Sequence, residues 1–159
     1  MRLLSVVPIA AMLLVVVASA PAQSDTSAPI YLYTAPVPIF GPEQAEFDKA
    51  MQVVLFPWND HGAPIDQSAL QANVQWLKDH PNVRFYVNGY ASSRGELIYN
   101  HVLAQKRADY IKETMIAMGL PENRIVLAVG WGQLYPVCPE LTDECWSKNR
   151  LVRLQYSPN

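Results

Sequence analysis

The stretch that decides the fold runs from Val87 to Arg107 and reads Val-Asn-Gly-Tyr-Ala-Ser-Ser-Arg-Gly-Glu-Leu-Ile-Tyr-Asn-His-Val-Leu-Ala-Gln-Lys-Arg. A strand ends at Gly89, a polar loop follows over residues 92–95, and a helix then begins. Asn100 and Arg107 project from nearly the same face of that helix, about two turns apart. A strand that delivers a loop and a guanidinium to one place predicts a small-ligand site.

Strands and helices alternate along the rest of the chain. Short apolar, β-branched runs predict strands at residues 52–56, 83–89, 125–129 and 150–156. Helical spacing of apolar residues predicts helices at residues 66–80 and 96–118. The second helix is expected to bury Val102, Ala108, Ile111, Met115 and Met118.

The order β-α-β-α-β-β is typical of an α/β domain, an α+β sandwich in which one mixed sheet carries both helices on one face. A long loop over residues 133–148, and not a crossover helix, joins the last two strands. We therefore expect the last strand to pair antiparallel with the third.

The N-terminal part reads as a targeting segment. A positive start at Met1 and Arg2, an apolar run over residues 3–17 and small residues up to Ala22 predict a secretory signal peptide at residues 1–22. The alternative is a transmembrane anchor, since the run is about as long as the shortest spanning helix. A Pro-rich extended leader is expected at residues 23–44, and the folded domain at residues 45–159.

The charge balance limits the classes of partner. Without Arg2 the chain has 11 basic and 14 acidic residues, a net charge of −3. This argues against a nucleic-acid partner, which needs a basic face. No later apolar run is long enough to cross a membrane, so no integral span is expected after signal cleavage.

The chain contains two cysteines, Cys138 and Cys145, and both follow the signal peptide. An even pair this close, in an oxidising compartment, favours a disulfide. The alternatives are a reactive thiol and a metal site, which would need two more ligands. No His or other Cys lies near in sequence, and we expect neither a metal nor a cofactor.

An ordered set of residues carries a resemblance to a known family. The set comprises Gly89, Gly95, Tyr99-Asn100, Leu103, Arg107-Ala108, Gly130-x-Gly132, Pro136 and Asn149-Arg150. Over residues 50–156 it resembles the OmpA-like domain of peptidoglycan-associated lipoproteins and flagellar stator proteins. The resemblance implies the fold expected above, a place in the periplasm of a Gram-negative bacterium, peripheral to the outer membrane, and binding of the diaminopimelate residue of a peptidoglycan stem peptide.

The resemblance also implies site residues. Arg107 stands where the family places the guanidinium that holds the ligand carboxylate, and Asn100 stands at the family's Asn. Ser92 replaces the Asp that binds the ligand ammonium, so this site has lost an anion. The other expected site residues are Arg94, Asn59 and Arg150; the last strand lacks the second Arg of the family pattern.

Structural roles are the alternatives at these positions: Arg107 would hold Asn149 or a backbone carbonyl, and Asn100 would satisfy local backbone groups. No nucleophile elbow and no cluster with metal-ligand spacing predicts an enzyme. We expect a non-catalytic module that binds peptidoglycan, weakened by the missing Asp. The alternative is a diverged interaction domain of the cell envelope without diaminopimelate binding, whose partner is an envelope protein met through the leader and Trp131.

Overall fold

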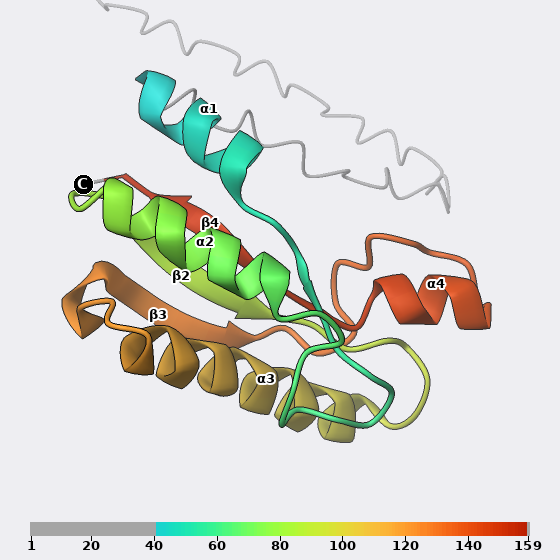
Figure 1. Ribbon diagram of the computed structural model, residues 1–159. Helices are drawn as coiled ribbons and strands as arrows, with labels where there is room; N and C mark the ends of the chain where they lie inside the picture. Colours follow the sequence, from blue (N-terminus) through green and yellow to red (C-terminus); the bar gives the residue numbers. More distant parts are fainter. Residues whose placement is uncertain (1–40, 159) are drawn as a thin grey trace, which may run out of the picture. The chain divides into compact units, whose positions relative to one another are not determined.

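The computed structural model describes residues 41–158 (Figure 1). The predicted signal peptide and most of the predicted leader lie outside these residues. The elements, in chain order, are α1 (Gly41–Ala50), β1 (Val54–Leu55), α2 (Ser68–Asp79), β2 (Arg84–Gly89), α3 (Leu97–Ala117), a 3-10 turn (Glu122–Arg124), β3 (Ile125–Gly130), α4 (Asp143–Lys148) and β4 (Leu151–Ser157). Helix α1 begins four residues before the expected domain boundary.

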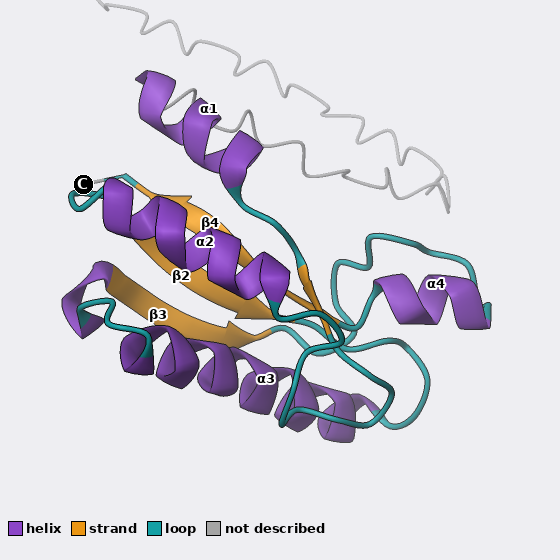
Figure 2. Ribbon diagram, in the orientation of Figure 1, coloured by secondary structure: helices purple, strands orange, loops and turns teal. Residues whose placement is uncertain are grey.

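The strands form one mixed sheet in the order β1-β4-β2-β3. Strand β2 pairs in parallel with β3, and β4 pairs antiparallel with both β2 and β1. The predicted pairing of the last strand with the third is therefore wrong. Helix α3 connects β2 to its neighbour β3, so one edge of β2 is already occupied. Strand β4 therefore pairs along the other edge of β2, and the long loop before β4 carries the chain past the end of β2 to that edge (Figure 2).

The sheet has one buried and one open face. Phe85 and Val87 of β2 are fully buried and belong to one cluster with side chains of α2 and α3. The alternating positions of β4, Arg153 and Gln155, are exposed on the other face. The prediction that both helices cover one face of a mixed sheet is confirmed.

The buried face of α3 differs from the predicted stripe. It comprises Asn100, Leu103, Ala104, Arg107, Ala108, Ile111 and Met115. Val102 is 46% exposed, so the prediction for this residue is wrong. At about 100° per residue, Val102 lies a full step away from the face that Leu103 and Arg107 share. Two polar side chains, those of Asn100 and Arg107, therefore share the buried face of α3 with its apolar residues.

Helix α3 lies directly against the backbone of the sheet. A Cβ atom at Gly89 would stand 2.1 Å from the carbonyl oxygen of Ala104, and one at Gly130 would stand 2.2 Å from the amide nitrogen of Gln105. The amide of Gly130 also donates to Gln105 Oε1 at 2.7 Å. These contacts require glycine at the ends of β2 and β3, and they fix the position of the N-terminal half of α3 relative to the sheet.

Helix α4 occupies the end of a segment that was expected to be a loop. Thr142 caps it, since Thr142 Oγ1 accepts the amide of Cys145 at 3.2 Å. None of the helices within residues 41–158 combines the length and the apolar character that membrane crossing requires.

Candidate functional site

A pocket of about 400 Å³ opens where the C-terminal end of β2 meets the start of α3. The loop after β1 and the first residue before β4 complete it. Its lining consists of Trp58, Asn59, Ala91, Ser92, Arg94, Gly95, Tyr99, Asn100, Leu103, Arg107 and Arg150. The six residues expected at the site from the sequence all lie in this lining.

Arg107 forms the floor of the pocket and is fully buried. Its Nε donates to the carbonyl of Asp60 at 2.8 Å, Nη1 to that of Tyr90 at 3.0 Å, and Nη2 to that of Pro57 at 3.0 Å. The structural role considered for this residue is therefore present, although Asn149 is not its partner. A guanidinium has five N–H groups, so two are free of these three bonds.

Burial lowers the pKa of Arg107 to about 10, and the positive charge of Arg150 adds to this effect. The guanidinium still carries its charge at neutral pH. Arg107 therefore supplies a positive charge at the bottom of the pocket while it ties together the loops after β1 and β2.

Among the three arginines of the lining, Arg150 has the fewest hydrogen bonds engaging its terminal Nη atoms. Its Nε donates to the carbonyl of Phe56 at 3.3 Å, and within residues 41–158 no hydrogen bond engages its Nη atoms. The side chain is half-buried. Burial lowers its pKa, and the carboxylate of Asp143 opposes that effect.

Ser92 and Asn100 supply neutral polar groups. Ser92 is 4% exposed, and its hydroxyl makes no hydrogen bond with any described residue. Asn100 is 3% exposed; its Nδ2 donates to the carbonyl of Arg94 at 3.3 Å and to Gln133 Oε1 at 2.9 Å. The local backbone role considered for Asn100 is thus present, but its Oδ1 accepts no hydrogen bond from the described part of the chain.

Aromatic side chains surround the mouth of the pocket. The guanidinium carbon of Arg94 lies 5.5 Å from the ring centroid of Trp58 and 5.4 Å from that of Trp146. Its Nη1 also pairs with Asp143 Oδ1 at 3.2 Å. Sequence reasoning gave neither tryptophan a site role, because Trp58 comes from the loop after β1 and Trp146 from α4, far apart in the chain. A Trp directly after a strand-ending proline was the one available signal for Trp58.

Asn59 stands at the rim in a left-handed conformation, with φ of 57°. Its Oδ1 accepts a hydrogen bond from the hydroxyl of Tyr99, whose ring is half exposed at 52%. This bond joins the loop after β1 to the first turn of α3. It holds one wall of the pocket in place.

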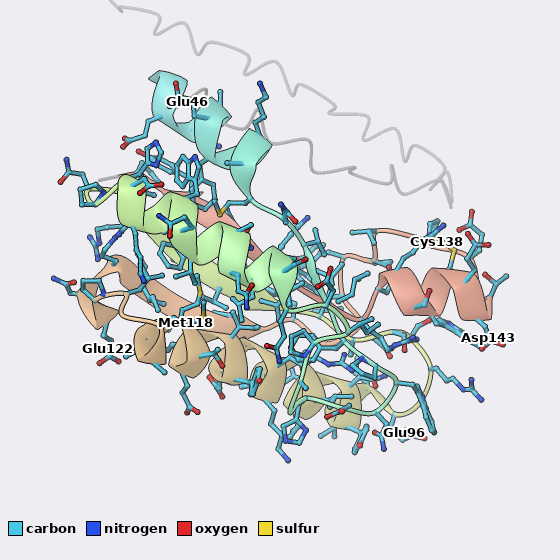
Figure 3. The ribbon with its side chains drawn as sticks, in the orientation of Figure 1. Glu46, Glu96, Met118, Glu122, Cys138 and Asp143 are labelled. Carbon is cyan, nitrogen blue, oxygen red and sulfur yellow. A yellow bond between two sulfur atoms is a disulfide. The ribbon has the colours of Figure 1, made fainter. Side chains whose placement is uncertain are left out.

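The lining contains three arginines and, among the described residues, no carboxylate. Asp60 lies close to Arg107, but its carboxylate accepts the amide of Gly62 at 2.8 Å, and mainly that bond lowers its pKa. Glu96 occupies the position just before α3, where its side chain makes no capping hydrogen bond, and it is exposed (Figure 3). Neither Asp60 nor Glu96 lines the pocket, so neither places a carboxylate beside the uncharged Ser92.

A disulfide joins Cys138 to Cys145, with 5.0 Å between the Cα atoms, and this confirms the predicted bridge (Figure 3). The metal and reactive-thiol alternatives are excluded in this oxidised state, because each sulfur is bonded to the other. Asn149 accepts the amide of Cys138 at 3.0 Å and donates to its carbonyl at 2.7 Å. The disulfide and these two hydrogen bonds together hold Cys138 against α4 and against Asn149, the residue that precedes Arg150.

We expect the double variant Cys138→Ser, Cys145→Ser to loosen α4 and leave the core intact. A bridge over so short a loop contributes about 2–3 kcal/mol. Amide hydrogen exchange should accelerate in residues 138–148 and stay unchanged in β2. Equal acceleration in β2 would contradict this local role.

Residues 63–150 match the OmpA family. The chain is 34% identical over 84 residues to the peptidoglycan-associated lipoprotein of Brucella melitensis, a match that covers 53% of this chain and 49% of that protein. It is 32% identical over 115 residues to the protein of the same name from Buchnera aphidicola, with 72% of this chain and 66% of that protein covered. The chain thus spans about half to two thirds of the length of these relatives.

Solved structures show the same fold. The peptidoglycan-associated lipoprotein of Burkholderia pseudomallei superposes with a TM-score of 0.62 at 29% identity, covering 67% of this chain and 90% of that one. The family match covers more than half of the present chain, and the topology and the glycines under α3 agree with the pattern seen in its sequence. The chain belongs to the OmpA family.

Proposed function

We propose that this protein is a non-catalytic module that binds the stem peptide of peptidoglycan in the periplasm of a Gram-negative bacterium, peripheral to the outer membrane. Relatives that carry the name peptidoglycan-associated lipoprotein support the partner and the compartment. The signal peptide expected at residues 1–22 agrees with export. Peptidoglycan is the partner, and the proposal requires no cofactor.

One observation carries this proposal. Six residues chosen from the sequence, on four separate segments of the chain, line a single pocket of about 400 Å³. That volume suits one amino-acid residue of a larger ligand. The charge of the lining suits a carboxylate, since arginine meets a carboxylate through paired hydrogen bonds.

The loss of the family's acidic residue weakens one half of the recognition. A ligand ammonium that enters beside Ser92 meets no carboxylate in the described lining. The loss of such a desolvated ion pair costs about 2–5 kcal/mol. Binding of diaminopimelate with a free amine is therefore expected to be weak.

Co-sedimentation with purified sacculi tests the function. We expect the protein to pellet with sacculi and the variant Arg150→Gln to remain in the supernatant, because Arg150 has unengaged donors at the pocket. The matched control is Arg153→Gln, which removes the same charge from the open face of the sheet. Only the pocket variant should lose binding.

Equal loss in both variants would point to nonspecific charge attraction. An absence of pelleting by the unmodified protein would contradict the proposal and favour the alternative, a diverged interaction domain of the cell envelope. In that case the open sheet face, over which the Trp131 indole donates to Asn88 Oδ1 at 2.9 Å, becomes the surface to examine.

A further inference from the structure

The charges of the pocket define one half of its ligand. Arg94, Arg107 and Arg150 bring three guanidinium groups to the lining, and no Asp or Glu of residues 41–158 lines it with them. Asp143 engages Arg94 at the rim, which leaves the Nη atoms of Arg150 as donors facing a ligand. This half fits a carboxylate.

The neutral groups define the other half. Ser92 Oγ and Asn100 Oδ1 belong to lining residues and make no hydrogen bond with the described residues, but neither is among the fully buried atoms that lack a partner, so both are accessible to a ligand in the pocket. An amide N–H can donate to either of these acceptors without adding charge. An ammonium would instead stand close to three guanidinium groups with no nearby anion in the lining, which like-charge repulsion disfavours.

The walls add apolar surface beside these groups. Trp58 is 63% exposed and Tyr99 is 52% exposed, and both line the pocket together with the side chain of Leu103. Exposed aromatic rings at the mouth of a pocket gain free energy when a ligand covers them. A free amine offers no apolar atoms there, whereas an acyl group does.

We propose that the pocket selects an amino acid that carries a free carboxylate next to an acylated amine, and discriminates against the same residue with a free amine. The inference rests on the proposed function. In a peptidoglycan stem peptide this chemistry occurs at the peptide C-terminus and at the side-chain end of a diamino acid whose amine has been acylated in a cross-link, and the inference concerns the second. Arg150 holds the carboxylate, and Ser92 and Asn100 face the amide.

Two synthetic stem tripeptides that end in diaminopimelate test the inference, and in both the carboxylate at the peptide C-terminus is converted to a carboxamide, so that only the side-chain end keeps a free carboxylate. They are identical except that the side-chain amine is free in one and acetylated in the other. Calorimetric titration of the protein is expected to show affinity at least about tenfold higher for the acetylated peptide, equivalent to about 1.4 kcal/mol. Ser92→Asp should reverse this order, because the new carboxylate favours an ammonium. The matched control Ser93→Asp, in the same loop but outside the lining, should keep the original order.

Equal binding of the two peptides, or tighter binding of the free amine by the unmodified protein, overturns the inference. The proposed function survives that result if the protein still pellets with sacculi through Arg150. If the protein pellets but binds neither peptide, the inference falls alone; if it neither pellets nor binds, both fall. Should Ser92→Asp fail to fold, as judged by circular dichroism, the preference of the unmodified protein decides the outcome.

Discussion

Replacing Arg107 by Met is expected to lower the free energy of unfolding by about 3–5 kcal/mol. The substitution leaves the carbonyls of Asp60, Tyr90 and Pro57 without their donor. Each orphaned buried carbonyl costs about 1–3 kcal/mol, and water at the pocket edge offsets part of this for the two partly buried bonds. Urea denaturation followed by circular dichroism measures the change.

Arg124→Met is the matched control. Arg124 is also buried and donates to three backbone carbonyls, those of Val83, Leu77 and His80. It does not line the pocket. Both variants should lose stability, but only Arg107→Met should lose sacculus binding at a temperature where both are folded. A loss of stability below about 1 kcal/mol for Arg107→Met would contradict the structural role of its guanidinium.

Gly130→Ala is expected to lower the free energy of unfolding by about 2–3 kcal/mol. The new Cβ would stand 2.2 Å from the amide nitrogen and 2.5 Å from the Cα of Gln105, so the backbone of α3 has to move away from the sheet. Overpacking of this kind typically costs about 1–3 kcal/mol. The shift also displaces the first turns of α3, which carry Asn100. Thermal and urea denaturation provide the measurement.

Gly62→Ala serves as its control. Gly62 is exposed, and a Cβ there meets only Asp60 Oδ1 at 3.5 Å. Its effect on stability should stay within about 0.5 kcal/mol. If the two alanine variants are equally stable, the close approach of α3 to the sheet at Gly130 is not what holds the helix in place.

The sequence predicted the elements of the fold better than their arrangement. Apolar patterns located the strands and the two long helices within a few residues. The pairing of β4 with β2 was missed, because connection length does not tell which edge of a sheet a strand joins. Helix α4 was missed because its six residues contain few apolar positions, and a cap and a disulfide define it.

The site was predictable as a set of positions but not as a set of contacts. The motif located the loop after β2 and the face of α3, and the structure places those residues around one pocket. The three carbonyls that accept hydrogen bonds from Arg107 belong to loops far from it in the sequence, and no local sequence pattern predicts these contacts. The aromatic pair around Arg94 depends in the same way on tertiary folding.

The claim that this pocket holds a stem peptide is tested most directly by an NMR titration. The isotopically labelled protein is titrated with the two stem tripeptides, free and acetylated, and the backbone amide shifts are mapped. We expect the shifts to cluster at Ser92, Gly95 and Asn100, which line the pocket. Shifts confined to the open sheet face, around Arg153 and Gln155, or no shifts with either peptide, would contradict the account.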